Sequence, residues 1–327
     1  MKRRDLLGFI VAALSAPSRL FAQQPARIYR VAVLWYGTES SARPYRQAVL
    51  AGLQELGYVA GRNLELHDRY GNGDPSRFPA LVDEKIALKP DLLAASTELA
   101  AGTMKAKTAI LPIVFLTGGD PVAAGLVQSL ARPGTNVTGL SNTSSLQITK
   151  RIELLVETVP RMSRLVFLLD ENDSEQRRTY EPIARAAAEA KGLRFGAIGI
   201  RNRQDLGRAF AEIEKQGQVG LVVSASALMI LLQREIVAEI RRLRLPAISY
   251  LAGIADEGLL MTYGVNLIET FRYSTIYVDK ILKGAKPANL PVEQYSKYEL
   301  VVNMRTAREI GIKIPQSILL RTDRVIE

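Results

Sequence analysis

The sequence contains no cysteine and a single histidine in 327 residues. The missing cysteines exclude a disulfide, a zinc–thiolate site, a thiol nucleophile and a lipid anchor attached through cysteine. His67 has no histidine or cysteine partner for a metal site or a catalytic triad, and it falls in an alternating segment typical of a strand. The segment 71–73 (GNG) completes no dinucleotide-binding pattern. We therefore expect neither a metal nor a cofactor.

The sequence also lacks a hydrophobic run long enough to span a membrane, which takes about 20 apolar residues. The apolar run at residues 6–16 follows Lys2, Arg3 and Arg4, and small and polar residues come after it. This order is typical of an export signal, with cleavage predicted after Ala22. Two arginines, a spacer and two leucines also match a twin-arginine signal, so Sec and twin-arginine export both stay open. We expect a periplasmic protein that is not inserted in the membrane after cleavage.

Neither sign of charge forms a long tract. Lysine and arginine outnumber aspartate and glutamate by 43 to 33, which gives a formal net charge of +10. A basic balance can indicate a nucleic-acid partner, but here the basic residues are scattered beside acidic ones and form no stripe interleaved with aromatics. We expect a solvated basic surface and no nucleic-acid partner.

From residue 30 onward, short runs of Val, Ile and Leu alternate with longer helical stretches. Residues 30–36 are predicted to form a buried parallel strand, and residues 42–57 an amphipathic helix ended by a glycine. Further strands are predicted at 63–70, 91–96 and 112–118, with helices near 76–89 and 97–109. The alternation predicts an α/β fold with a doubly wound parallel sheet.

The same series recurs after roughly 130 residues, which is a two-copy duplication and not a solenoid. Segments 164–170, 189–200, 219–226 and 244–253 correspond in order to 30–36, 55–70, 90–97 and 110–118. Near-constant spacing across four elements predicts two lobes of one topology.

The C-terminal part breaks this tandem pattern. It contains a strand at 258–264, a long helix at 266–284, a proline-containing linker at 286–294, and a strand and helix at 298–311. We predict that the chain returns to the first lobe and then to the second, so that three crossovers form a hinge. The predicted division is a signal peptide at 1–22, a first lobe of 23–141 plus 265–291, and a second lobe of 142–264 plus 292–327.

Residues 118–139 have the sequence GGDPVAAGLVQSLARPGTNVTG. With segments 53–81, 258–294 and 298–315, this run resembles the family of ABC-transporter substrate-binding proteins related to the streptococcal tryptophan-binding protein. The resemblance implies a type I periplasmic-binding fold that captures a small solute for an ABC permease in the inner membrane. It favours an amino acid, with an aromatic one as the narrower option. The loop at 170–176 departs from the family pattern, which leaves the ligand contacts of the second lobe undefined.

Small hydroxyls, amides and aromatic residues follow the predicted strands. In open α/β sheets, ligands bind beyond the carboxyl ends of the strands, and two facing lobes turn that region into a cleft. Such side chains suit hydrogen bonding and stacking on a small ligand. The predicted ligand-binding residues are Tyr36, Gly37, Thr38, Ser96, Thr97, Thr117, Gly118, Asp120, Asn142, Asn172, Ser224, Tyr250 and Tyr263.

Several of these positions carry two hypotheses. Asp120 follows two glycines and precedes a proline, so it suits either a ligand ammonium or the N-cap of a helix. Ser96 and Thr97 stand where a strand meets a helix, either near N–H groups that attract a ligand carboxylate or as ordinary caps. Trp35 could stack on a ligand or pack in the core. Asp170 and its acidic neighbours could form an acid–base pair, but we favour a solvated loop.

Three functions fit these features. We favour a non-catalytic binding component of an importer. The alternatives are a ligand-sensing domain for a membrane receptor and an enzyme on the same two-lobed scaffold. An enzyme of this kind would need a cysteine pair, a histidine base at a strand end or a phosphate loop. The sequence has none of these, so we expect no catalytic residues.

Overall fold

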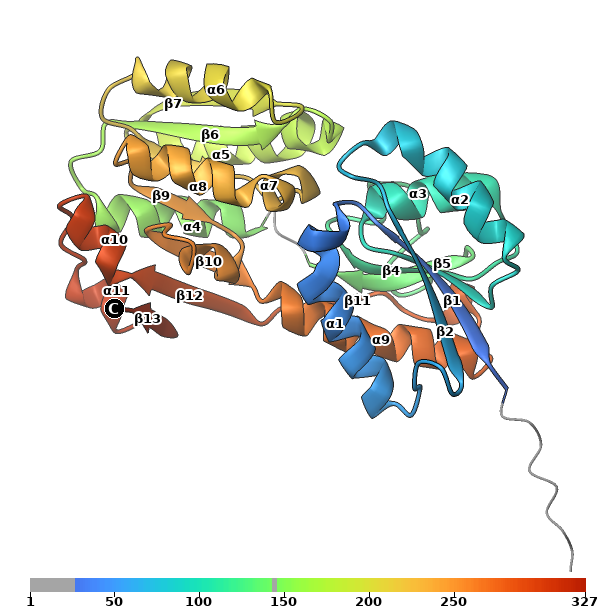
Figure 1. Ribbon diagram of the computed structural model, residues 1–327. Coiled ribbons are helices and arrows are strands. Elements are labelled where there is room, and N and C mark those ends of the chain that lie inside the picture. Colours follow the sequence, from blue (N-terminus) through green and yellow to red (C-terminus); the bar gives the residue numbers. More distant parts are fainter. Residues whose placement is uncertain (1–26, 143–145) are drawn as a thin grey trace, which may run out of the picture.

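The computed structural model describes residues 27–142 and 146–327, which form two lobes side by side (Figure 1). The predicted signal peptide, residues 1–22, lies outside the described residues. Each lobe is a sheet with helices on both faces, as the alternating sequence predicts. Within the described ranges, no helix combines the length and the hydropathy that a membrane span requires.

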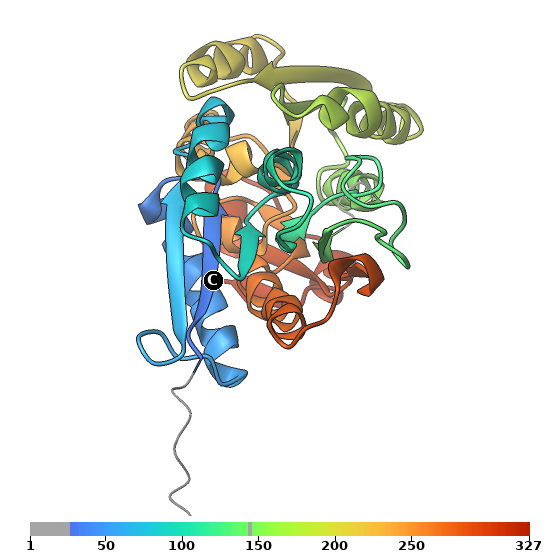
Figure 2. The same cartoon turned by 90° about the vertical axis from the view of Figure 1, so that its right-hand side faces the viewer.

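The first lobe contains a six-stranded parallel sheet. Helices α1 and α9 cover one face and α2 and α3 the other, and Figure 2 shows β1 and β2 side by side. The strand order is β11-β5-β4-β3-β1-β2, with β1 at Tyr29–Trp35, β2 at Leu64–Tyr70, β3 at Leu92–Ala95, β4 at Ile113–Gly118, β5 at Val137–Ser141 and β11 at Glu293–Gln294. The helices are α1 (Glu39–Glu55), α2 (Phe78–Ala87), α3 (Glu98–Lys107) and α9 (Leu267–Leu282).

The second lobe contains a seven-stranded sheet in which only β10 and β12, among the described strands, pair antiparallel. Its order is β13-β12-β10-β9-β8-β6-β7, with β6 at Arg164–Asp170, β7 at Arg194–Ile200, β8 at Gly220–Val223, β9 at Ala247–Ser249, β10 at Met261–Val265, β12 at Tyr298–Asn303 and β13 at Arg324–Ile326. The helices are α4 (Leu146–Thr158), α5 (Glu181–Glu189), α6 (Asp205–Glu214), α7 (Ala227–Leu231), α8 (Gln233–Arg242), α10 (Met304–Glu309) and α11 (Gln316–Leu319). The terminal strand β13 was not predicted.

The two sheets share one topology, because the order β5-β4-β3-β1-β2 in the first matches β10-β9-β8-β6-β7 in the second. This agreement confirms the duplicated fold that the repeated segments predict. In both lobes the central strands are buried on both faces: residues 31–35 of β1 and 165–170 of β6 are all buried. Parallel sheets covered by helices require such continuous apolar strands.

The chain passes between the lobes three times. It leaves the first sheet after β5, returns between β10 and α9, and crosses again between β11 and β12. Strand β11 pairs with β5, so the first lobe extends to Gln294, slightly beyond the predicted limit at residue 291. Helix α9 crosses α1 closely at Gly52, where an added Cβ would lie 2.5 Å from Thr275 Oγ1.

Lys85 is a buried cation in the first lobe. Its side chain in α2 is 1% exposed, and its Nζ donates to the backbone carbonyl of His67 in β2 at 2.6 Å. Burial lowers the pKa of Lys85 from 10.5 to about 7, because the interior stabilises an ammonium less well than water does. Between these two pH values the unfolded chain holds a proton that the folded chain has released.

We expect the free energy of unfolding to rise with pH between 7 and 10, and this rise to flatten in Lys85→Met. At pH 7 the variant should be more stable by on the order of 1–3 kcal/mol, allowing for the lost bond to His67. Chemical denaturation at pH 7, 8.5 and 10 measures both effects. Lys215→Met, at an exposed lysine, is the control. Parallel pH profiles for wild type and Lys85→Met would contradict the assignment.

Candidate binding cleft

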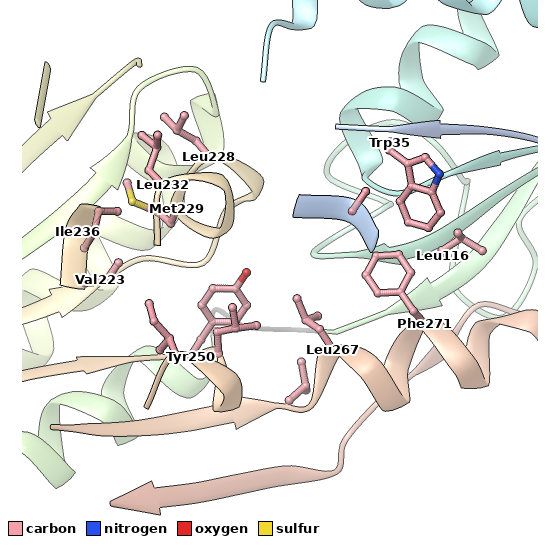
Figure 3. Packing of buried hydrophobic residues seen from close by; sticks show 14 of the residues in the cluster. Trp35, Leu116, Val223, Leu228, Met229, Leu232, Ile236, Tyr250, Leu267 and Phe271 are labelled. Atoms are coloured by element: carbon pink, nitrogen blue, oxygen red, sulfur yellow. The ribbon is translucent and has the colours of Figure 1, made fainter. Parts of the chain in front are cut away.

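A cleft of about 830 Å³ lies between the lobes, at the carboxyl ends of strands from both sheets. The first lobe contributes the ends of β1, β3 and β4, and the second contributes those of β6, β8 and β9. Figure 3 shows Trp35 and Phe271 on the first lobe, Tyr250 on the second, and Leu267 between them. The volume falls in the range typical of small-molecule sites.

Nine of the predicted residues line this cleft, and four do not. Those that line it are Tyr36, Gly37, Ser96, Thr97, Thr117, Gly118, Asn142, Asn172 and Tyr250. Thr38, Asp120, Ser224 and Tyr263 are not part of the lining. The strand-end rule therefore located the cleft, whereas the role of each side chain depends on its local contacts.

Three of the other four residues belong to the framework around the cleft. Thr38 caps α1, accepting a hydrogen bond from the N–H of Ser41 at 3.2 Å. Ser224 is 2% exposed, behind the cleft wall. Tyr263 stacks on Tyr298 with ring centroids 5.9 Å apart, at the crossover between the lobes.

Asp120 caps a turn and not the predicted helix. Its Oδ1 accepts from the N–H groups of Val122 and Ala123, each at 3.0 Å, and residues 121–125 form turns without a regular helix. Asp120 therefore caps backbone N–H groups, as the capping hypothesis predicts, but they belong to a turn and not to a helix. These two bonds occupy the oxygen that would otherwise be offered to a ligand.

Ser96 and Thr97 also use their hydroxyls for the fold. Ser96 Oγ accepts from the N–H of Tyr36 at 2.9 Å, and Thr97 Oγ1 accepts from the N–H of Ala100 at 3.2 Å as the N-cap of α3. The geometry favours the capping hypothesis for Thr97, whereas Ser96 binds the backbone just after β1 and caps no helix.

One wall of the cleft is aromatic. The rings of Trp35 and Tyr45 lie 5.8 Å and 5.0 Å from the ring of Phe271. Asp68 fixes the indole, because its Oδ1 accepts from Trp35 Nε1 at 2.7 Å. Trp35 is 1% exposed, so it belongs to the core and supports the wall at the same time. Tyr45 and Phe271 come from helices α1 and α9, and for that reason the strand-end rule missed them.

Part of the cleft lining is acidic and comes from both lobes. Asp170 lines the cleft from the end of β6, Asp173 and Glu175 from the loop that follows, and Glu98 from the start of α3. Asp170 is 4% exposed, and its burial raises its pKa to about 6. The prediction of a solvated loop is thus wrong for Asp170, whereas Glu171 forms an ion pair with Arg177 outside the lining.

Two buried polar atoms of the lining have no hydrogen-bond partner within the described part of the chain. They are Tyr36 Oη and Glu98 Oε1. An unpaired buried polar group costs on the order of 1–3 kcal/mol, so such atoms concentrate where another group is to be bound. No cluster of acidic and histidine side chains in residues 27–142 and 146–327 has the composition of a metal site.

The lobes touch across the cleft through Leu231, at the end of α7. Its side chain occupies the space that a Cβ would need on Gly73, whose φ is +76°, and it lies near Gly37 as well. Leu231 packs against the apolar cluster of the first lobe that includes Tyr36. The two lobes are therefore in contact across the cleft.

Comparison with known proteins supports the fold. A relative named tyrosine-binding protein, from Clostridioides difficile strain R20291, is 21% identical over 269 residues, which cover 82% of this chain and 76% of the relative. The ABC domain from Streptococcus pneumonia in complex with L-Trp is 23% identical with a TM-score of 0.84 and covers 91% of this chain and 100% of that one. A conserved domain protein from Vibrio cholerae is 24% identical with a TM-score of 0.85 and the same coverage.

A family model described as ABC transporter substrate binding protein matches residues 30–326. The match extends over both lobes and all three crossovers. It agrees with the resemblance carried by residues 118–139 and by the C-terminal segments. The chain belongs to the family of ABC transporter substrate-binding proteins.

Proposed function

We propose that this protein is the periplasmic binding component of an ABC-type importer and that it captures an amino acid, most specifically an aromatic one, in the interlobe cleft. The observation that carries this proposal is the pairing of an aromatic wall with acidic residues inside one interlobe cleft. Residues 1–22, with the pattern of an export signal, support a periplasmic location. The family implies an ABC permease as the partner.

The aromatic wall suits a flat side chain. Phe271 and Tyr45 present rings whose centroids are 5.0 Å apart, and aromatic pairs gain about 0.5–1.5 kcal/mol beyond area burial. A third ring stacked on this wall would extend the same packing. The adjoining residues, such as Leu267, are apolar and keep water from the ring.

The polar remainder of the cleft suits a zwitterion. Glu98 and Glu175 offer negative charge for an ammonium group, and the exposed guanidinium of Arg178 lines the same cleft. The side-chain amide of Asn142 donates a hydrogen bond to Thr117 Oγ1 at 2.8 Å, and both residues add polar groups to the lining. Charge-assisted bonds of this kind are the strong ones in a site shielded from water.

The relatives point the same way. One of the similar solved structures is a complex with L-Trp, and the relative from Clostridioides difficile is named tyrosine-binding protein. These relatives are solute-binding proteins and not enzymes, so we propose the same non-catalytic role here, without a cofactor.

A thermal-shift screen tests the ligand class. We expect L-tryptophan, L-tyrosine or L-phenylalanine to raise Tm, because a ligand at a hundred times its Kd stabilises the folded protein by about 2.7 kcal/mol. Sugars and aliphatic amino acids at the same concentration serve as controls. A shift with a sugar and none with any amino acid would overturn the proposed function.

Tyr45→Leu tests the aromatic wall. The change keeps apolar volume but removes the ring, so affinity for the aromatic amino acid should fall by about 2- to 10-fold. Tyr273→Leu is the matched control, because Tyr273 is an exposed tyrosine of α9 outside the cleft lining. Calorimetric titration of both variants decides the matter, and equal losses would count against stacking on this wall.

Leu231→Ala tests closure. Leu231 contacts the first lobe only when the lobes are together, so its truncation should cost about 1–1.5 kcal/mol of the closed state and about tenfold in affinity. Small-angle scattering should show a larger radius of gyration for the ligand-free variant. Leu320→Ala, at a leucine that is 78% exposed, should change neither quantity. A Leu231→Ala variant with wild-type affinity and radius would remove this contact from the closing mechanism.

A further inference from the structure

We propose that Glu98 is the specificity-determining residue of the cleft: together with Glu175 of the opposite lobe, it selects ligands that carry a positively charged nitrogen, and it releases a proton when such a ligand binds. This inference rests on the proposed function and assigns the group that recognises the amino end of the ligand.

Glu98 lies across the end of β4. A Cβ added to Gly118 would be 2.5 Å from Glu98 Cγ and 2.7 Å from its Oε1, so Gly118 leaves the space that the acid occupies. The N–H of Gly119 donates to the carboxyl group. Glu98 lines the cleft, and its Oε1 is buried without a hydrogen-bond partner within the described residues.

The charges that act most strongly on Glu98 are all negative. Asp120 approaches from the turn after β4, and Asp173 and Glu175 approach from the loop after β6 in the second lobe. Tyr180 brings this loop close, because its hydroxyl donates to Glu175 Oε2 at 3.4 Å and lies 3.0 Å from a Cβ placed on Gly119. Acidic groups of both lobes therefore meet at this point.

The cations of the lining leave Glu98 itself uncompensated, because the charges of the described residues that act most strongly on it are all carboxylates. Lys107 is paired with Asp83 at 2.8 Å, and Arg178, an exposed side chain, acts on Glu175. Burial, followed by the neighbouring carboxylates, raises the pKa of Glu98 to about 8, and burial also raises the pKa of Glu175. Near pH 7 the empty cleft thus holds Glu98 mainly in its neutral form.

An ammonium group placed between Glu98 and Glu175 supplies the missing positive charge. It favours the ionised carboxylate, so the proton of Glu98 leaves for the solvent as the ligand enters. The cation then contacts a carboxylate from each lobe, which stabilises the closed state over the open one. An aromatic acid without an amino group supplies no positive charge to compensate these carboxylates.

Calorimetric titration with three related probes tests the assignment: L-tryptophan, tryptamine and indole-3-propionate. Titrations at pH 7 in phosphate and in Tris, whose ionisation enthalpies differ, count the protons released. We expect wild type to release about 0.9 proton with L-tryptophan, given a pKa of about 8. Indole-3-propionate should bind ~30-fold more weakly or worse.

The variants separate Glu98 from its neighbours. Glu98→Gln should lose ~30-fold or more in affinity for L-tryptophan and release no proton. Glu171→Gln, at an acid that lies outside the lining and is paired with Arg177, should stay within about threefold of wild type. Glu175→Gln should weaken binding of L-tryptophan and tryptamine but not of indole-3-propionate. This second variant keeps the proposal testable if Glu98→Gln folds poorly.

The outcomes distinguish this inference from the proposed function. If L-tryptophan binds without proton release and Glu98→Gln keeps wild-type affinity, Glu98 is not the selector, although the cleft still takes an amino acid. If indole-3-propionate binds wild type and neither amine does, both the amino-acid function and the role of Glu98 are wrong.

Discussion

The burial of both faces of each sheet is the constraint on which the rest of this structure depends. Helices cover both faces of the two sheets, so strands such as β1 and β6 consist of nearly continuous apolar residues. Polar groups can then emerge only where the strands end. Because the two lobes turn these ends toward each other, one cleft collects the aromatic wall, the hydroxyls and the acids.

The acidic part of the cleft lining links ligand charge to closure. Glu98 comes from the first lobe, whereas Asp170 and Glu175 come from the second, and burial raises the pKa of all three carboxyl groups. Closing the lobes removes these groups from water, so the closed state is electrostatically costly unless a cation is held between them. In the proposed function, the ligand itself supplies that cation.

The hinge and the cleft wall are joined by direct contacts. Arg151 of α4, a buried residue, donates through Nε to the carbonyl of Tyr263 in β10 at 2.8 Å. Its guanidinium also lies 5.8 Å from the ring centroid of Tyr250, which lines the cleft. Tyr263 in turn stacks on Tyr298 at the crossover. These contacts connect the cleft wall to the strands next to the crossovers.

The sequence by itself determined the α/β fold, the duplication and the general position of the cleft, because periodicity and strand ends are local properties that recur along the chain. The family came from the resemblance of particular segments, above all residues 118–139. It could not assign the roles of individual side chains. Asp120 has the same neighbours in sequence whether it caps a turn or faces a ligand, and only its contacts show the cap. Glu98 resembles any acid in the first turn of a helix. Tertiary structure alone decided its surroundings, by laying it over Gly118 and bringing Glu175 toward it from the other lobe, where burial and like charge act through space and not along the sequence.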